Sequence, residues 1–398
     1  MTTRRSILLL AGSGLALAAA GCRETVQAAA TTAPDVLLAD SDHGLLRLGP
    51  AGEQSLGAAV AAFDGSHLYA ARPGALDQVN PATGEAVRST ALAEGWLPRV
   101  VSADGRVCAL SRTGASDRPT ARARTTLLIT APAGPKQHEL PGVIEPDAFT
   151  ADGTGLFVLE WLPATAPDRY RVRLLDLATG DIQPLATRAK TPVPPGAEEE
   201  MRGDGRQAVL SADRQMLFTL YTHQPGHQHT RDLLSGRPGN AHAFVHVLHL
   251  TERWAYCLDL PHPFGEGPAA GHALAADGRN LIVADVTSGR LAYASPESLS
   301  IERVVDVPVA AGSTAALALT TDGRILLGAG GVTVLDRASG RPAGDWALPG
   351  PVRGLALSRD GSRLHAGGAG RITWLDTGTG TRRGDLAVPG LTWLRHAL

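Results

Sequence analysis

Short apolar segments separated by Asp-Gly pairs recur along most of the chain. The clearest copy, residues 354–380, contains three apolar segments, an Asp-Gly pair, a glycine-rich turn and a final Asp-x-x-x-Gly. Asp-Gly between alternating apolar segments is a strong hairpin signal, because Gly accepts the positive φ of a tight turn. The pair begins at six aspartates: Asp64, Asp104, Asp152, Asp277, Asp322 and Asp360. A degenerate seventh copy is Asp213-Arg214.

A second turn pattern follows several of the first. It spans Asn80–Gly84, Asp176–Gly180, Asp336–Gly340 and Asp376–Gly380, each after an apolar segment. Asp or Asn at such a position can bond its own backbone two residues on. The two patterns together predict four strands per repeat. A repeat of about 40 to 45 residues with four strands is the signature of a β-propeller blade.

The two ends of the repeat region predict how the ring closes. Residues 36–57 have the pattern of strands two to four of a blade, and residues 390–395 have that of a first strand. Joining them makes one split blade without an exposed sheet edge. Seven marked repeats and one split repeat predict an all-β propeller of eight blades, with seven as the alternative if one weak repeat is misassigned.

Three polar segments interrupt the repeat. Residues 112–124 are rich in arginine, residues 189–204 are rich in proline and then acidic, and residues 223–240 are long and polar. We expect all three to be surface loops. The last two account for the widest separations between successive aspartates.

The N-terminus predicts export and a lipid anchor. Arg4-Arg5 and the apolar stretch of residues 7–21 resemble a twin-arginine export signal, and Ala19-Ala20-Gly21-Cys22 resembles a bacterial lipobox, with Ala19 where Leu is commoner. We expect residues 1–21 to be removed, Cys22 to be acylated, residues 22–35 to form a flexible tether and residues 36–398 to form the propeller. The predicted location is the outer face of the cell membrane. A plain secretory signal with a coincidental cysteine is the alternative.

Composition restricts the partners. A formal net charge of −2 argues against a nucleic-acid partner. We expect a monomer that binds an envelope protein, a peptide or a small ligand. Cys108 and Cys257 fall on predicted strands two blades apart, so we expect buried free thiols rather than a disulfide.

Histidine is concentrated between His223 and His272. Imidazole is a common ligand of zinc and copper. His242 and His246 lie on a predicted strand and would be about 13 Å apart, too far to share one ion. His227 and His229, with His223, lie in a predicted loop and are the candidate metal ligands. No neighbouring carboxylate or cysteine completes a familiar ligand spacing, so a divalent metal ion is an alternative rather than the leading cofactor prediction, which is none.

Propellers bind ligands through the loops that enter the innermost strands around the central channel. In this chain those positions are predicted to face the channel as a polar, ligand-binding surface. They are Trp96, Arg99, Glu145, Asp147, His262, Glu266, His272, Arg353, Trp393 and Arg395.

Motifs of several enzyme classes are missing from the sequence. The mature chain has no Gly-x-Ser-x-Gly, no His-Glu-x-x-His and no phosphate-binding loop. We therefore assign no catalytic residues. A lactonase- or lyase-like enzyme that uses a divalent cation in the channel is the enzymatic alternative, with Glu145, Asp147 and Glu266 as its carboxylates.

The repeated pattern of strand, Asp-Gly, strand and Asp-x-x-Thr-Gly behind an export signal resembles the extracytoplasmic YVTN and WD40-like propellers of bacteria. The resemblance covers about residues 36–398 and implies the fold. These propellers have many functions, so the resemblance implies no particular activity. The leading functional prediction is a membrane-anchored lipoprotein that acts as a ligand-binding or protein-binding scaffold.

Overall fold

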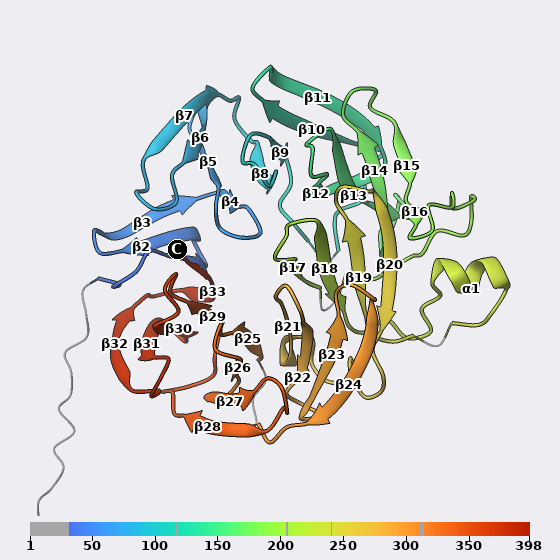
Figure 1. Ribbon diagram of the computed structural model, residues 1–398. Helices are drawn as coiled ribbons and strands as arrows, with labels where there is room; N and C mark the ends of the chain where they lie inside the picture. The colour runs from blue at the N-terminus through green and yellow to red at the C-terminus, as the bar shows by residue number, and fades with distance from the viewer. Residues whose placement is uncertain (1–31, 117, 204–205, 240, 310–313) are drawn as a thin grey trace, which may run out of the picture.

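Eight sheets form a ring in the computed structural model, which describes residues 32–116, 118–203, 206–239, 241–309 and 314–398 (Figure 1). The predicted all-β propeller is therefore confirmed, and eight blades are observed rather than seven. The predicted export signal and Cys22 lie outside the described residues. Among the helices described, none is long and apolar enough to cross a membrane.

Seven blades are formed by consecutive strands, and the eighth combines both ends of the chain. We number the consecutive blades 1 to 7. Blade 1 is β4 (Ala59–Ala61), β5 (Leu68–Arg72), β6 (Ala75–Val79) and β7 (Ala86–Ala91). Blade 2 is β8 (Leu97–Val101), β9 (Cys108–Ser111), β10 (Arg124–Ala131) and β11 (Gly134–Pro141). Blade 3 is β12 (Val143–Phe149), β13 (Gly155–Leu162), β14 (Arg169–Asp176) and β15 (Ile182–Pro184). Blade 4 is β17 (Gln207–Leu210), β18 (Met216–Tyr221), β19 (Phe244–His249) and β20 (Trp254–Asp259), with the short β16 (Ala186–Thr187) parallel to β20.

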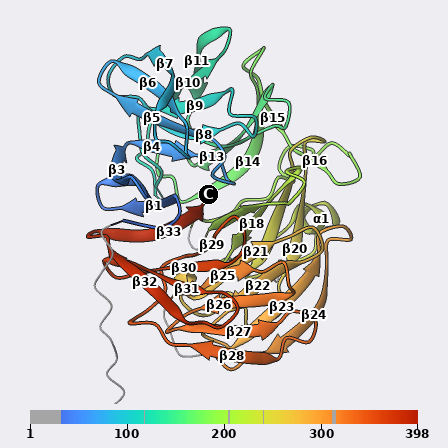
Figure 2. The same ribbon diagram turned by 60° about the vertical axis from the view of Figure 1, so that its left-hand side comes forward.

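Blades 5 to 7 and the split blade complete the ring, as Figure 2 shows from a second side. Blade 5 is β21 (His272–Ala276), β22 (Leu281–Asp285), β23 (Arg290–Ser295) and β24 (Ser300–Asp306), and blade 6 is β25 (Ala316–Leu319), β26 (Arg324–Gly328), β27 (Val332–Asp336) and β28 (Pro342–Trp346). Blade 7 is β29 (Leu355–Leu357), β30 (Arg363–Gly368), β31 (Arg371–Asp376) and β32 (Arg382–Ala387). The split blade is β1 (Leu37–Ser41), β2 (Gly44–Gly49), β3 (Gly52–Gly57) and β33 (Leu391–Ala397). The short helices are α1 (Thr230–Ser235) and the 3-10 turn η1 (Ala269–Gly271).

The Asp-Gly pairs join the first and second strands of the blades, as predicted. The Asp360 carboxylate accepts hydrogen bonds from Ser358 Oγ at 2.6 Å and from the backbone N–H of Ser362 at 3.0 Å. The degenerate copy keeps this turn, because Arg214 adopts a φ of 60° in place of Gly. Asp213 also accepts the same pair of hydrogen bonds from its neighbours. The aspartate therefore preserves the hairpin where the glycine is lost.

The ring closes where the sequence predicted. β33 pairs with β1, with Leu37 opposite Ala397 and Ser41 opposite Leu391. Asp35 accepts two hydrogen bonds of 2.8 Å from Arg363 and contacts His365 Nε2 at 2.8 Å. Asp35 belongs to the expected tether, so contacts with the ring begin before residue 36.

Apolar side chains fill the spaces between neighbouring blades, and the outer strands are more polar. All four residues of β9 and all five of β22 are buried, whereas most of β7 is exposed. Cys108 and Cys257 are buried free cysteines, as predicted. The repeat therefore buries its inner strands and leaves its fourth strand in contact with solvent.

The acidic insertion is mostly exposed, as predicted, but part of it packs on blade 3. Within the expected surface loop of residues 189–204, the side chain of Glu198 is only 9% exposed. It pairs with Arg171 at 2.9 Å and Arg173 at 3.0 Å, both on β14. Two opposite charges compensate the buried carboxylate, so this part of the insertion packs on blade 3 instead of extending into solvent.

Candidate functional site

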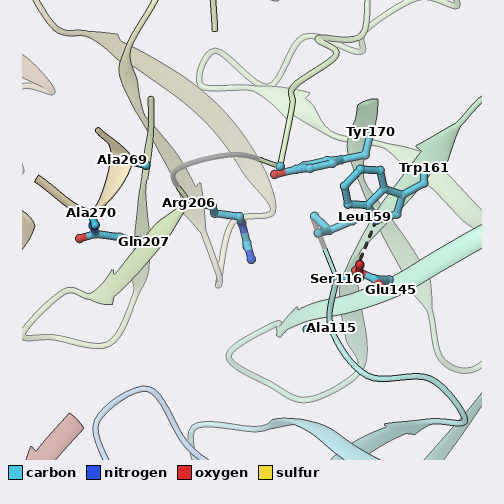
Figure 3. A pocket seen from close by; sticks show the side chains of 11 residues that line it. Ala115, Ser116, Glu145, Leu159, Trp161, Tyr170, Arg206, Gln207, Ala269 and Ala270 are labelled. Carbon is cyan, nitrogen blue, oxygen red and sulfur yellow. Dashed lines mark hydrogen bonds between the residues drawn. The ribbon is translucent and has the colours of Figure 1, made fainter. Parts of the chain in front are cut away.

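A cavity of about 360 Å³ opens between blades 2 and 5 (Figure 3). Trp161 and Tyr170 of blade 3 form one side, and Ala269 and Ala270 before blade 5 form the other. Arg206, directly before β17, extends between the two sides. Four neighbouring blades, 2 to 5, thus contribute to one pocket, which we call the channel-mouth pocket.

Glu145 and Asp147 carry the acidic charge of this region. Both lie on β12, where a bulge between Pro146 and Ala148 breaks the register with β13. Residues two apart on a strand normally face the same side, and the bulge changes the local direction of these side chains. Glu145 is 4% exposed and Asp147 is 6% exposed. Two carboxylates are therefore held almost out of water.

The partners of these carboxylates are unequal. Asp147 forms an ion pair with Arg206, which also donates to Tyr221 Oη at 3.3 Å. Glu145 Oε2 accepts a hydrogen bond from Trp161 Nε1 at 3.3 Å, but Oε1 has no hydrogen-bond partner among the described residues (Figure 3). Glu145 thus keeps one buried oxygen available for hydrogen bonding.

Burial and nearby positive charges act in opposite directions on Glu145. Burial raises the pKa of its carboxyl group, and Arg99, Arg122 and Arg206 only partly offset that effect. The pKa of Arg206 is raised well above its usual range despite burial, because Asp147 stabilises the guanidinium. Arg206 thus stays charged beside a carboxyl group that is costly to ionise.

The other predicted channel residues do not line this pocket. Three of them form local contacts at the surface: His262 Nδ1 lies 2.8 Å from Glu266 Oε1, and Arg395 donates to Asp40 at 2.7 Å. His272 is fully buried and accepts a hydrogen bond from the backbone of Gly265 at 2.9 Å.

Four further predicted residues have packing or backbone contacts. The ring of Trp96 is covered by Arg112 at 4.4 Å, and Trp393 packs in the core between blades. Arg99 donates to Thr113 O at 2.7 Å, and Arg353 donates to Leu391 O at 3.1 Å. Of the ten predicted residues, Glu145 lines the pocket. Asp147 pairs with Arg206, which also lines it, and the charge of Arg99 acts on Glu145.

Arg206, Trp161 and Tyr170 were not predicted from the sequence. Arg206 occupies the position before an innermost strand, the same position that identified other candidates. Blade 4 lacks a regular Asp-Gly pair, so its first strand was not located closely enough to assign this residue. Trp161 and Tyr170 lie on the second and third strands of blade 3, and no sequence signal separates them from core residues.

The predicted metal ligands lie outside the channel, on the outer side of blade 4. His227 and His229 precede α1, which lies beside β20 in both views (Figures 1 and 2). They meet two residues that the sequence did not connect with them, Glu199 of the acidic insertion and Cys257 of β20. Glu199 Oε2 lies 2.9 Å from Cys257 Sγ, 3.2 Å from His229 Nδ1 and 3.4 Å from His227 Nε2. We call these four residues the blade-4 cluster.

His223 is separate from this cluster in its described contacts. Its Nδ1 lies 2.8 Å from Thr222 Oγ1, and its φ is 58°. In the sequence, no carboxylate or cysteine lies near these histidines at a familiar ligand spacing. The fold supplies both, because Glu199 and Cys257 are distant in sequence and no local spacing reveals them.

The charges of the blade-4 cluster are strongly coupled. Burial alone would lower the pKa of His229, but hydrogen bonds to Asp259 and Glu199 outweigh it and raise the pKa to about 9. Burial alone would raise the pKa of Glu199, but His227 and His229 hold it well below its usual range. Burial raises the pKa of the Cys257 thiol, and Glu199 adds to that effect.

Comparison with known proteins assigns no family to this chain. No family model matches the chain, and no curated protein matches it. Solved structures align over most of its length at low identity. Apo AztD from Citrobacter koseri is 11% identical with a TM-score of 0.40, covering 83% of this chain and 97% of that one. The dihydro-heme d1 dehydrogenase NirN in complex with DHE is 14% identical with a TM-score of 0.47, covering 89% and 73%. The computationally designed Ika8 protein is 13% identical with a TM-score of 0.46, covering 92% and 90%. The chain is an eight-bladed β-propeller.

Proposed function

We propose that this protein is an exported, lipid-anchored binding propeller whose ligand occupies the channel-mouth pocket. The observation that carries the proposal is the buried Glu145 Oε1, which has no hydrogen-bond partner among the described residues. Leaving a buried acceptor unsatisfied costs roughly 1–3 kcal/mol, and more for a charged group. A ligand that donates a hydrogen bond to this oxygen would recover that energy.

The pocket favours a small zwitterion, such as a free amino acid. Its amino group would donate to Glu145, and its carboxylate would accept from Arg206. The guanidinium has five N–H donors, and its described contacts are with Tyr221 through Nε and Asp147 through Nη2. Arg206 can therefore serve a second acceptor without giving up Asp147.

The enzymatic alternative has less support. A cation in the channel needs several converging ligands, and Glu266 forms its described contact with His262 at the surface. Within the described ranges, the group of three or more potential metal ligands that lie close together is on blade 4 and not in the channel. Location outside the cytoplasm follows from the N-terminal sequence pattern, and the anchor would hold the propeller close to the membrane.

Thermal-shift measurements and calorimetry with the twenty free amino acids and a set of sugars would test the proposal. At about 100 times the Kd, a ligand that binds only the folded state stabilises it by about 2.7 kcal/mol. We expect at least one amino acid to raise Tm, and Glu145→Gln to abolish the effect. Glu139→Gln, at an exposed position of β11, is the matched control and should retain it. Stabilisation by sugars alone, or an unchanged shift in Glu145→Gln, would refute the assignment.

A further inference from the structure

We propose that the blade-4 cluster is a Zn²⁺ site, with Glu199, His229 and Cys257 as ligands and His227 as the fourth. This site is separate from the channel-mouth pocket, and none of its four residues lines that pocket. The proposal does not depend on the function suggested for the pocket. It assigns a role to the two insertions that lengthen the repeat before and within blade 4.

The donor atoms of the blade-4 cluster lie close together. Ligand atoms of Glu199, His229 and Cys257 all lie within 4.8 Å of one another. Bonds of about 2.3 Å to sulfur and about 2.0–2.1 Å to nitrogen put neighbouring ligands of a tetrahedral zinc roughly 3.3–3.7 Å apart. Glu199 Oε2 now contacts the other three donors, so an ion bound between them would require this carboxylate to move.

Other residues orient the proposed ligands. His229 presents Nδ1 to the cluster, and its Nε2 is hydrogen-bonded to Asp259, which pairs with Arg231. A carboxylate on the far nitrogen fixes the orientation of a metal-binding histidine and makes it a better donor. The ring of His227 stacks on Phe244 with 4.4 Å between the centroids.

The proposed ligands are buried, and one of them borders a cavity. His227, His229 and Cys257 are 6%, 2% and 3% exposed, so few waters would compete for the ion. His227 also lines a cavity of about 390 Å³ together with Gln224 and Gln228. This cavity therefore borders one of the four proposed ligands.

The donor set selects the class of metal. One thiolate, two imidazoles and one carboxylate suit Zn²⁺, whereas Mg²⁺ and Ca²⁺ prefer ligands that are all oxygen. Binding would remove the proton from Cys257 and any proton shared between His229 and Glu199, which is normal for sites with these ligands. The alternative is a hydrogen-bond network that only stabilises the fold, and metal titration separates the two.

The experiment uses the full chain, stripped with a chelator and titrated with Zn²⁺ against a chromophoric competitor. We expect one tightly bound ion per chain. Cys257→Ser and His229→Ala should weaken binding at least about 100-fold, and Asp259→Asn, which keeps all four ligands, about 10–100-fold. Two matched controls should bind as the wild type: Cys108→Ser, at the other buried thiol, and Glu200→Gln, at the exposed neighbour of Glu199.

A Co²⁺ spectrum provides a measurement that does not depend on affinity. A thiolate ligand gives Co²⁺ an intense near-ultraviolet charge-transfer band, which should appear in the wild type and disappear in Cys257→Ser. Circular dichroism would show whether each variant folds, and Asp259→Asn still tests the site if the ligand variants do not. The proposal is overturned if Zn²⁺ does not saturate at one equivalent, if Cys257→Ser binds as tightly as Glu200→Gln, or if bound Co²⁺ lacks the thiolate band.

Discussion

Leu394→Ala should destabilise the propeller far more than Arg395→Ala, although the residues are adjacent on the closing strand. Leu394 is 1% exposed and belongs to the core shared by blade 7 and the split blade, of which β33 is a strand. Its backbone N–H donates to Arg353 O at 2.8 Å, which joins β33 to blade 7. The Arg395 side chain is 46% exposed and pairs with Asp40 at the surface.

The expected magnitude follows from how little the site can collapse. Replacing a buried Leu with Ala costs about 2–5 kcal/mol, and the cost rises with the cavity that remains. Besides the apolar side chains of this core, backbone approaches Leu394 closely, which limits how far the site can collapse. A Cβ added to Gly354 would lie 2.1 Å from Leu394 O, and one added to Gly367 would lie 3.0 Å from Leu394 Cβ. We therefore expect about 3–5 kcal/mol, against at most about 1 kcal/mol for the exposed ion pair of Arg395.

Urea unfolding followed by tryptophan fluorescence, with the m-value fitted for each variant, would measure both changes. Folded proteins are stable by only about 5–15 kcal/mol, so the Leu394 variant should lose a large share of its stability. A smaller loss for Leu394→Ala than for Arg395→Ala would contradict the account of ring closure. So would an unchanged unfolding midpoint for Leu394→Ala.

Three further predictions concern charge and location. Arg363 lowers the pKa of Asp35, so this carboxylate stabilises the fold above its unfolded pKa, near 3.8, and the contribution disappears as pH falls through the lower folded value. Asp35→Asn should therefore lower Tm at pH 7 and make little difference in acid below that folded value, as measured by calorimetry across pH. Burial raises the pKa of Glu145, so ionising it opposes folding. Glu145→Gln should accordingly raise the stability of the ligand-free protein at pH 7, and the gain should shrink as pH falls towards 4.5, the pKa expected of an unfolded Glu, in denaturant titrations. Finally, Cys22→Ala should move the protein from the membrane fraction to the soluble fraction on immunoblots if Cys22 is acylated; unchanged membrane association would exclude this anchor.

The architecture could be predicted because it repeats. Each Asp-Gly turn is formed by residues within a few positions of one another, so seven copies gave seven independent signals. Even Asp213, which has lost its Gly, was recognisable from its neighbours. The split blade was predictable because its two halves keep the pattern of a complete blade.

The candidate sites were less predictable because their partners are far apart in sequence. His227 and His229 drew attention as a local group, but Glu199 lies 28 and 30 residues away and Cys257 lies on a different strand. Arg206 reaches Asp147 across 59 residues. No periodic pattern encodes these contacts, since they depend on how an irregular insertion packs on a regular sheet.

The two sites also share a physical origin in the acidic insertion. Glu199 contributes to the blade-4 cluster, and Arg206, which follows the insertion, contributes to the channel-mouth pocket. Glu198 is held by Arg171 and Arg173, and Met201 exchanges backbone hydrogen bonds of 2.8 Å with Tyr170. These contacts fasten the segment to β14 before it enters blade 4, so a regular sheet positions the irregular segment. The repeat supplies rigidity, and the segment that departs from it supplies the side chains that a ligand or metal would contact.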